Sequence, residues 1–266
     1  MKGTIIYNKN KKEAVELNKK YSQFFLSKGI DIVPETDIKS VNFVVVIGGD
    51  GTLLRASKTI IKNPDVHVFA VNAGSLGFLT EIKSDEFEIT FENYLKGYFK
   101  VEERAFLKLK YGQEEADILN EVVISKKNAI SRILNLKVYS GKKYLCTYKA
   151  DGVIVATPTG STAYSLSAGG PIVMPGLKAT VVTPLAPHNL TTRPIILDGN
   201  EKLKISLDSD QNGCVIVDGE IKKEDFSYGE NIEIFYSDKK LKLISPEGRD
   251  YYGILRDKLK WGDNLC

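Results

Sequence analysis

The sequence predicts an α/β domain with a parallel sheet, followed by a β-rich domain of the sandwich type. Over residues 1–100, short β-rich runs alternate with segments of helical spacing, which is typical of parallel strands joined by helices. From about residue 101, β-rich segments follow one another between turns, which is typical of a sandwich. This change of pattern places the two domains at residues 1–100 and 101–245.

The first domain is expected to alternate strands and helices from its start. A helix from about Lys12 to Lys28 carries apolar residues at helical spacing and stops at Gly29, a residue type common just past a helix end. The apolar run Phe43–Ile47 predicts a buried strand, and helical spacing resumes after the glycines that follow it. The other strands are expected at 4–7, near 32 and at 66–71, and the last helix at 85–96.

The second domain is expected to consist mostly of short strands, with one helical exception at 161–168. These strands are expected at 106–111, 118–125, 133–139, 152–157, 179–183, 203–207, 214–217, 231–236 and 241–244. Residues 249–260 return to helical spacing. That change motivates the hypothesis that the tail, residues 246–266, packs back on the first domain.

Composition limits the partners that the protein is expected to have. Lys and Arg total 37 against 34 Asp and Glu, and a net charge of +3 gives no electrostatic reason to expect nucleic acid or an anionic membrane. No apolar run approaches the ~18 residues that a membrane span requires, and Thr4–Tyr7 is too short for a signal-peptide core. The 3 cysteines are far apart and odd in number, which predicts a reducing cytoplasm.

The strongest local signal is Gly48-Gly49-Asp50-Gly51-Thr52, between a predicted strand and a predicted helix. The glycines let the backbone approach a phosphate beside the positive end of a helix. An aspartate there repels phosphate, so Asp50 is expected to accept a proton from an attacking hydroxyl or to help hold a divalent cation. The alternative is a tight turn in which Asp50 caps the helix. Since the P-loop and Gly-x-Gly-x-x-Gly motifs are both missing, an ordinary P-loop enzyme or dehydrogenase is disfavoured.

The second signal is the hydroxyl-rich segment Thr157–Pro171. Five Ser or Thr residues and three glycines follow Thr157, and hydroxyls and amides at a helix start can bind phosphate or ribose. The ring of Tyr164 offers a surface for stacking on a base. The alternative is a capped turn in which Tyr164 packs as a structural residue.

The third signal is a set of polar residues in or beside apolar strands. Asn120-Glu121 lies inside the predicted strand 118–125, and Asp151 immediately precedes the strand 152–157. A carboxylate paired with an amide is suited to the vicinal hydroxyls of a ribose, as in dinucleotide folds. For Asn120-Glu121 in isolation, the alternative is a solvent-facing position on a strand.

Taken together and in this order, the motifs closely resemble those of the NAD kinase family. The first motif is shared with phosphofructokinases and diacylglycerol-type lipid kinases, whereas the hydroxyl-rich segment is highly characteristic of NAD kinases. The resemblance covers nearly the full length and implies a Rossmann-like, phosphofructokinase-like parallel sheet and a β-rich NAD-binding domain. The residues that carry it are Gly48–Thr52, Asn72–Thr80, Asn120-Glu121, Asp151 and Thr157–Pro171.

The resemblance implies an enzyme that transfers phosphate from ATP to the adenosine ribose 2′-hydroxyl of NAD, giving NADP. It further implies a divalent metal ion such as Mg²⁺, and a homodimer or homotetramer. By position, Asp50 is expected to accept the proton, and Gly48, Gly49, Gly51 and Thr52 to surround the donor phosphates. No side chain is assigned as a metal ligand.

The residues expected to contact NAD are carried over from the same resemblance. They are Asp50, Gly51, Phe78, Asn120, Glu121, Lys149, Asp151, Thr162, Ala163, Tyr164, Ser165 and Ser167. Arg132, Ala186 and Glu220 fall near further contact positions, outside the tight motifs.

Two other functions are compatible with parts of the pattern. A diacylglycerol- or sphingosine-type lipid kinase can share the glycine turn, but it is expected to have an apolar entrance and no segment like Thr159–Gly170. A non-catalytic NAD-binding regulator needs Asn120, Glu121 and Asp151 but not Asp50. Formation of NADP from NAD and ATP distinguishes the three.

Overall fold

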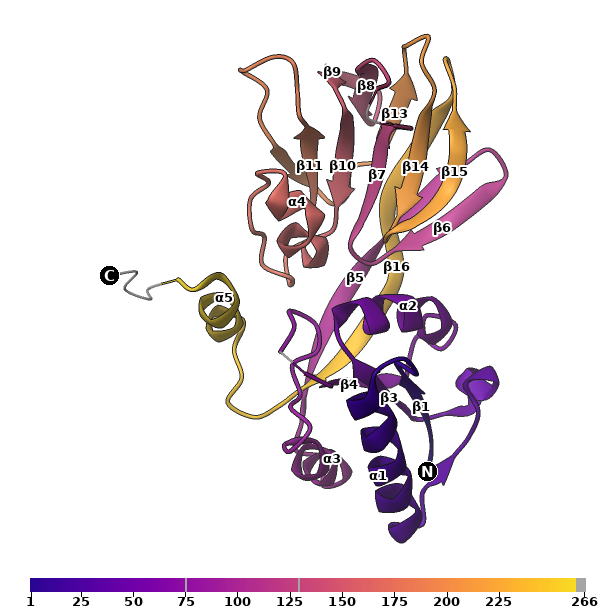
Figure 1. The fold of residues 1–266 in the computed structure, drawn as a ribbon, viewed down its shortest axis with the longest axis vertical. Coiled ribbons are helices and arrows are strands. Elements are labelled where there is room, and N and C mark those ends of the chain that lie inside the picture. The colour runs from indigo at the N-terminus through magenta and orange to yellow at the C-terminus, as the bar shows by residue number, and fades with distance from the viewer. Residues whose placement is uncertain (75, 129, 262–266) are drawn as a thin grey trace. The chain divides into compact units, whose positions relative to one another are not determined.

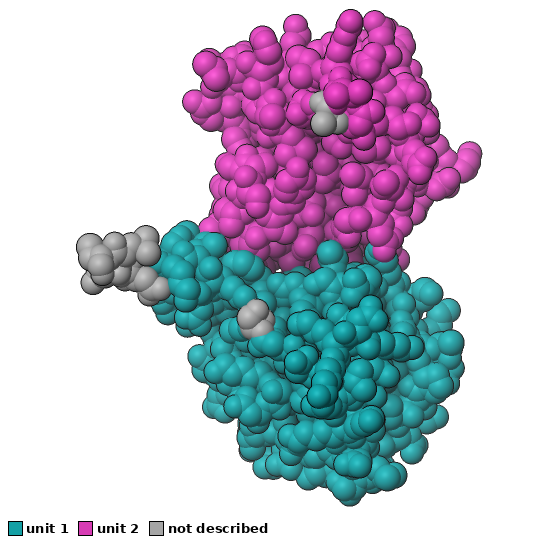
Figure 2. All heavy atoms as spheres, in the orientation of Figure 1, with its two compact units in different colours: residues 1–103, 241–266 teal, residues 104–240 magenta. Residues whose placement is uncertain are grey.

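The computed structural model describes residues 1–74, 76–128 and 130–261 (Figure 1). The chain forms two compact units: unit 1 comprises residues 1–103 and 241–266, and unit 2 comprises residues 104–240 (Figure 2). The chain passes between the units within two long strands, β5 (Lys100–Tyr111) and β16 (Asn231–Ser245). Unit 1 therefore takes residues 241–245, because the end of β16 pairs with a strand of unit 1.

Unit 1 contains a parallel sheet, whose apolar residues are buried in its central strands and partly buried toward one edge. The strand order is β2 (Asp31–Ile32), β1 (Lys2–Tyr7), β3 (Phe43–Gly48), β4 (His67–Asn72) and the end of β16. β1 leads to β2 on one side, whereas its neighbour β3 leads to β4 on the other. Ligands of open α/β sheets bind beyond the carboxyl ends of strands at such a switch point.

Helices cover both faces of this sheet. α1 (Lys12–Ser27) and α3 (Phe87–Leu95) bring an aromatic cluster to one face, where Phe25 and Phe91 contact Phe43 of β3 with ring centroids 5.2 and 4.9 Å apart. Side chains alternate along a strand, so the buried Val44 and Val46 face the other side, where α2 (Asp50–Ile60) packs on β3. The remaining helices of unit 1 are η1 (Glu35–Ser40) and α5 (Tyr251–Leu259).

Unit 2 is a β-sandwich, which confirms the predicted fold class. One antiparallel sheet has the order β12 (Ile195–Asp198), β11 (Ala179–Leu185), β10 (Gly152–Ala156), β7 (Glu121–Lys126), β14 (Gly213–Val217) and β15 (Glu220–Phe226). The second contains the start of β16, β13 (Leu203–Leu207), β8 (Leu134–Ser140) and β9 (Lys143–Ala150), with β5 and β6 (Glu114–Ile118) beside them. Inward-facing residues of both sheets, such as Val122, Val155, Leu136 and Ile205, form one buried core.

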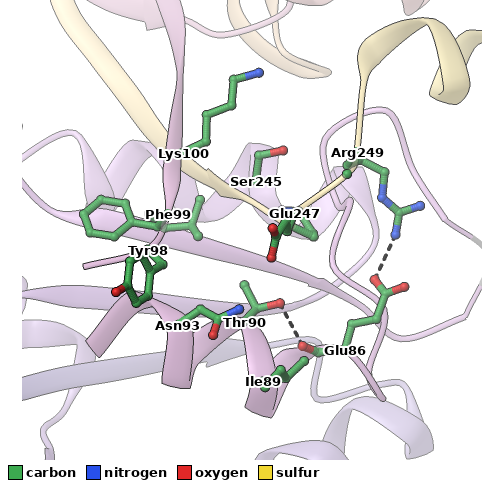
Figure 3. A pocket seen from close by; sticks show the side chains of 13 residues that line it. Glu86, Ile89, Thr90, Asn93, Tyr98, Phe99, Lys100, Ser245, Glu247 and Arg249 are labelled. Atoms are coloured by element: carbon green, nitrogen blue, oxygen red, sulfur yellow. Dashed lines mark hydrogen bonds and ion pairs between the residues drawn. The ribbon is translucent and has the colours of Figure 1, made fainter. Parts of the chain in front are cut away.

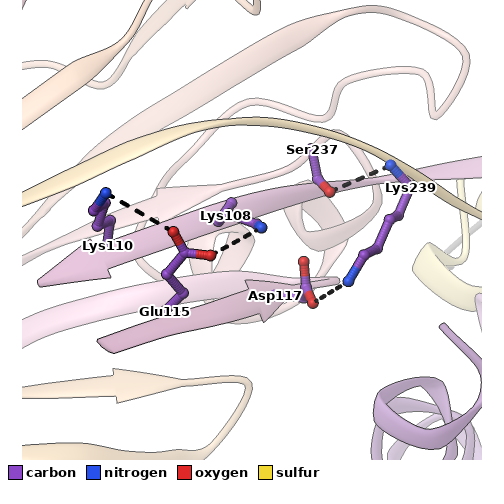
Figure 4. Close-up of polar contacts among 6 residues, drawn as sticks. All are labelled: Lys108, Lys110, Glu115, Asp117, Ser237 and Lys239. Atoms are coloured by element: carbon purple, nitrogen blue, oxygen red, sulfur yellow. Dashed lines mark hydrogen bonds and ion pairs between the residues drawn. The ribbon is translucent and has the colours of Figure 1, made fainter. Parts of the chain in front are cut away.

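The outer surface of β5, β6 and β16 carries ion pairs. Lys108 pairs with Glu115 at 3.1 Å and Lys239 with Asp117 at 3.1 Å (Figure 4). Both pairs are partly exposed to solvent, and ion pairs at a protein surface stabilise it by ~1 kcal/mol or less. We therefore assign these residues to the surface of the sandwich and not to a site.

The structure corrects several predicted elements. The strand predicted at 118–125 is interrupted, since β6 ends at Ile118 and β7 begins at Glu121. Asn120 is therefore outside any strand and not inside one, because the amides of this break bond to a side chain instead of a neighbouring strand. The strands predicted at 231–236 and 241–244 are one continuous strand, β16.

Other elements were missed or divided differently. Strands β9, β12 and β15 were not predicted. β15 is rich in charged residues and β12 is only four residues long, whereas β9 follows the tight turn at Gly141 directly after β8. The helix predicted at 161–168 is two short elements, η2 (Thr159–Thr162) and α4 (Tyr164–Ser167). Within the described parts of the chain, no helix has both the length and the hydropathy of a membrane span.

Candidate active site

In unit 1, the glycine turn lies at the carboxyl end of β3 and opens α2. Gly48 ends the strand, and a Cβ there would lie 2.7 Å from the Cβ of Thr52, so only glycine fits. At Gly49 and Gly51 an added Cβ would meet no atom within 4 Å. The backbone at these two positions is therefore open to a ligand, at the end of a helix where amides lack partners in the helix.

Asp50 is the first residue of α2, and its carboxylate is held by a second segment of unit 1. Oδ1 accepts hydrogen bonds from the amides of Leu79 and Thr80, both at 3.1 Å, and from the Thr80 hydroxyl at 3.0 Å. Oδ2 accepts one, from the amide of Phe78 at 2.8 Å. These contacts differ from the predicted alternative of a helix cap, because the donors come from the turn after β4 and not from α2.

The motif Asn72–Thr80 is explained by this contact. A Cβ at Gly77 would collide with Oδ1 of Asp50, so glycine is required where the turn closes over the carboxylate. The side-chain amide of Asn72 donates to the Thr80 hydroxyl at 3.0 Å. The first two motifs of the sequence are thus one structural unit, in which Phe78 is half-buried beside Asp50. Ser75 of this motif lies outside the described residues.

In unit 2, the junction between β6 and β7 is tied to the start of the hydroxyl-rich segment. The Thr157 hydroxyl donates to the carbonyl of Leu119 at 2.6 Å and accepts the amide of Gly160 at 2.9 Å. The Thr157 amide donates to the carbonyl of Asn120 at 2.9 Å. Glu121, which ends one motif, and Thr157, which begins the other, are 36 positions apart in the sequence, and these hydrogen bonds join the two motifs into one cluster.

Gly160 makes the closest approach in this cluster, and its substitution gives a test of the cluster. A Cβ at Gly160 would collide with the carbonyl of Asn120 and would lie 2.7 Å from the Cα of Asn120. These are backbone atoms, which cannot rotate away as a side chain can. Gly160→Ala is expected to lower the free energy of unfolding by about 1–3 kcal/mol, as overpacking does. Urea denaturation measures this change.

A matched control for this substitution is Gly176→Ala. Gly176 has open space around the position of an added Cβ. The change there is expected to stay within ~0.5 kcal/mol. Equal stabilities of the two variants would show that Gly160 does not lock the junction.

Glu121 opens β7 and is a buried carboxylate. The residue is 8% exposed, and its Oε2 has no hydrogen-bond partner among the described residues. The pKa of Glu121 is raised to about 7, first by burial and second by the charge of Asp218, while the Tyr164 amide, which donates to the carboxylate, opposes the rise. The predicted solvent-facing alternative for this residue is wrong, and Oε2 is an unused acceptor in a buried position.

The hydroxyls of η2 and α4 fall into two groups. Those of Ser161 and Ser165 are buried and used inside unit 2: Ser161 bonds to Pro158 and Val173, and Ser165 pairs with Thr183 at 2.9 Å. The Thr162 hydroxyl donates to the Thr159 carbonyl at 3.2 Å. By contrast Tyr164 and Ser167 are exposed, and Ala163, the residue between the two helices, is half-buried. The exposed members are therefore the ones free to meet a ligand through their side chains.

Asp151 lies at the opposite end of β10 from Glu121. Ala156 pairs with Glu121 and Asp151 precedes the other end of the strand, so five residues at ~3.3 Å each separate the two by ~16 Å. Asp151 forms an ion pair with Lys126 at 2.8 Å, and its amide donates to the Leu185 carbonyl.

Three more predicted residues gather at the Asp151 end. Lys149 is the second-last residue of β9 and lies two positions before Asp151, Ala186 follows β11, and Arg132 lies exposed in the loop from β7 to β8. Glu220 is the exception, because it starts β15 opposite Val217, at the Glu121 end. The predicted NAD contacts in unit 2 therefore form two groups, one at each end of β10.

Sequence reasoning missed Thr80, Gly77 and Asp218 as parts of these clusters. Thr80 and Gly77 were included in a motif without a role, and their role depends on the approach of Asp50 from another strand. Asp218 has one local signal, the Asp-Gly doublet between apolar and polar strands that is typical of a hairpin turn.

A pocket of unit 1 lies outside all of these clusters. It has a volume of about 930 Å³ and is bordered by α3, the start of β5 and residues 244–249 (Figure 3). Tyr98 and Phe99 line it, and Arg249 pairs with Glu86 across it at 2.8 Å. None of the predicted site residues is among its lining residues, so we do not include it in the site.

Comparisons with known proteins agree with the motifs. Family models for the ATP-NAD kinase N-terminal and C-terminal domains match residues 33–99 and 119–245. An NAD kinase of Fusobacterium nucleatum is 47% identical over 268 residues, covering 100% of both chains. An NAD kinase of Geotalea daltonii is 41% identical over 93% of this chain and 86% of its own length.

Solved structures share the fold. A yeast NADH kinase complexed with NADH superposes with a TM-score of 0.87 at 24% identity, covering 100% of this chain and 89% of the other. An NAD kinase from Archaeoglobus fulgidus in complex with ATP has a TM-score of 0.82 at 23% identity, covering 98% and 99%.

The fold, the glycine turn and these matches define a phosphotransferase with an alcohol group as acceptor. The chain belongs to the NAD kinase family. The resemblance inferred from the motifs is thereby confirmed.

Proposed function

We propose that this chain transfers the terminal phosphate of ATP to the 2′-hydroxyl of the adenosine ribose of NAD, and that Asp50 receives the hydroxyl proton. ATP-dependent phosphorylation of NAD is the activity of the family to which the chain belongs. The observation that carries the role of Asp50 is the geometry of its carboxylate beside the open glycine backbone. Phosphoryl transfer needs mainly in-line positioning and charge neutralisation, with little covalent chemistry by the protein.

The hydrogen bonds of Asp50 support this role. Oδ1 accepts three bonds, whereas Oδ2 accepts one. A carboxylate oxygen has about two lone-pair sites, so Oδ2 keeps capacity for a further donor such as a substrate hydroxyl. The amides of Phe78, Leu79 and Thr80 fix the direction of the carboxylate, which a positioned base requires.

The donor phosphates are proposed to bind the backbone of Gly48, Gly49 and Gly51, with Thr52 beside them. The open space at Gly49 and Gly51 and the helix N-terminus of α2 support this assignment. We further propose that Mg²⁺ neutralises the phosphates. Within the described residues no group of three or more His, Cys, Asp or Glu side chains could hold a metal, so the ion is proposed to use phosphate oxygens and water as ligands.

NAD is proposed to meet the two groups of residues in unit 2. Glu121 is the most specific of them, because a buried carboxylate with an unused oxygen stabilises a ligand that donates a hydrogen bond to it. In unit 2, the residues proposed to contact NAD together with Glu121 are Asn120, Thr162, Ala163, Tyr164, Ser165 and Ser167, and those of the second group are Lys149, Asp151, Arg132 and Ala186. In unit 1, Phe78 is also proposed to contact NAD. Glu220, at the Glu121 end, completes the set.

A homodimer or homotetramer in the cytoplasm is also proposed. Ile130 and Leu190, in the loops at the Asp151 end of unit 2, are 94% and 90% exposed, and we place both in the proposed subunit interface. Cys146 and Cys214 are free thiols, which suits a reducing compartment. Sedimentation analysis of the wild-type chain and of Leu190→Asp tests the assembly.

One assay tests the proposed function. The purified protein is incubated with NAD, ATP and Mg²⁺, and NADP is measured over time. Formation of NADP is the expected result. Phosphorylation of diacylglycerol or sphingosine in vesicles instead would establish a lipid kinase, and binding of NAD without turnover of ATP would establish a regulator.

A further inference from the structure

Asp218 occupies the turn between β14 and β15, next to the start of β7 (Figure 1). Its carboxylate accepts hydrogen bonds from three consecutive amides, those of Leu119, Asn120 and Glu121, at 2.9, 2.9 and 3.1 Å. The Asp218 amide donates in return to the Glu121 carbonyl at 3.0 Å. Four hydrogen bonds thus join one turn residue to the three-residue junction that presents Asn120 and Glu121.

The backbone of Asp218 is adapted to this contact. Its φ is +49°, in the left-handed region, and Gly219 follows at +79°. Asp and Asn are the residues other than glycine that tolerate this region best. The left-handed backbone of Asp218 directs its carboxylate at the junction. The hydrogen bonds from the three amides offset the free-energy cost of this backbone conformation.

Asp218 is also the charged neighbour of Glu121. Burial is the main cause of the raised pKa of Glu121 and the charge of Asp218 is the second. Among the described residues, no cation contributes to the pKa of Glu121: β10 brings Ala156, and α4 brings the Tyr164 amide. Glu220, the first residue of β15, forms an ion pair with Lys222 at 3.1 Å.

We propose that Asp218 is a positioning residue for NAD, which holds Asn120 and Glu121 in the geometry that grips the nucleotide. This inference rests on the proposed function, in which Asn120 and Glu121 contact NAD. Asp218 acts on NAD through its hydrogen bonds to these two residues. Its negative charge also raises the pH at which Glu121 ionises. Ionised Glu121 accepts hydrogen bonds from hydroxyls, so NAD binds more tightly as pH rises and Glu121 loses its proton.

Asp218→Asn separates positioning from a merely structural role. Asn keeps the left-handed backbone and an oxygen that accepts the amides of Asn120 and Glu121, but it loses the bond from Leu119 and the negative charge. At pH 8, we expect the Kd for NAD, measured by calorimetry, to rise ~10-fold, as for one lost bond to a charged group. We expect kcat to change much less than the KM for NAD. This is the result when the lost interaction stabilises the ground state and the transition state equally.

The pH dependence of the Kd gives the readout that a structural role would not change. In the wild type, the midpoint of the pH dependence follows Glu121. In Asp218→Asn it is expected to move to lower pH, because a negative neighbour has been removed. An unchanged midpoint, or an unchanged Kd for NAD at pH 8, would overturn the inference.

Asp198→Asn is the matched control for this substitution. Asp198 ends β12 of unit 2 and, like Asp218, accepts a backbone amide, from Asn200 at 2.8 Å, but it is exposed and three strands from β7 in the sheet order. We expect the control to have the wild-type Kd for NAD at pH 8 and the wild-type midpoint of its pH dependence. Since calorimetry requires no turnover, a wild type that binds NAD without forming NADP contradicts the proposed reaction, and the Asp218 variant still tests this inference.

Discussion

Asp50→Asn is expected to lower the kcat for NADP formation by at least ~100-fold, the lower end of what a positioned base contributes. Asn cannot receive the proton of the 2′-hydroxyl. It keeps an oxygen for the amides of Leu79 and Thr80, and loses the acceptor of the Phe78 amide. The Kd for NAD is therefore expected to rise by no more than ~10-fold, as for one hydrogen bond. The measurements are NADP formation at saturating NAD, ATP and Mg²⁺, and calorimetry with NAD.

The tether of Asp50 needs its own control. Thr80→Val removes the hydroxyl that donates to Oδ1 at 3.0 Å and leaves the carboxylate in place. The expected loss of kcat is less than ~10-fold, because one neutral donor of four is removed. Turnover by Asp50→Asn above a tenth of the wild-type value would refute the proton-acceptor role. An equal loss in Thr80→Val would assign the effect to positioning.

Glu121→Gln is expected to raise the free energy of unfolding at pH 8 by about 3 kcal/mol and to change it by less than about 1 kcal/mol at pH 5. The pKa of Glu121 is raised in the folded protein from 4.5 to about 7, by burial first and by Asp218 second. The folded state therefore binds the proton more tightly than the unfolded state. In the wild type, stability is lost as pH rises from about 4.5 to about 7, and the cost is complete above that range.

Gln removes this cost because it is neutral at every pH and can still accept the Tyr164 amide. The measurement is urea denaturation at pH 5 and pH 8 without NAD. Glu201→Gln, at an exposed turn before β13, is the control and is expected to leave the pH dependence of the wild type unchanged. A difference in free energy of unfolding between the Glu121→Gln variant and the wild type that is the same at pH 5 and pH 8 would contradict this prediction. That result would show that ionisation of Glu121 does not destabilise the folded state.

The motifs of the site could be predicted because each depends on local chemistry. Glycines at 48, 49 and 51 after an apolar strand predict a ligand-facing turn, and the structure leaves open backbone at two of them. The number of hydroxyls in Thr157–Pro171 overestimated how many of them are available to a ligand. Ser161 and Ser165 bond inside unit 2, so part of the hydroxyl density stabilises the fold and does not face a ligand.

The partners of the site residues could not be predicted, because they come from distant parts of the chain. The bond from Thr80 to Asp50 spans 30 positions, and the bond from Glu121 to Asp218 spans 97. The burial of Glu121 could not be predicted either, because the residues that cover it also come from distant parts of the chain. A strand pattern gives the face on which a residue lies, but its neighbours depend on which strands pair.

By itself, the sequence determined the α/β and sandwich architecture, the family and the positions of the motifs, since hydrophobic period, glycine turns and motif order are local properties of the chain. Only the tertiary structure decided that Asp50 is tethered by Phe78–Thr80 and that Glu121 is buried beside Asp218. Hydrogen-bond partners and desolvation depend on groups brought together by strand pairing, and these groups set the chemistry of each carboxylate.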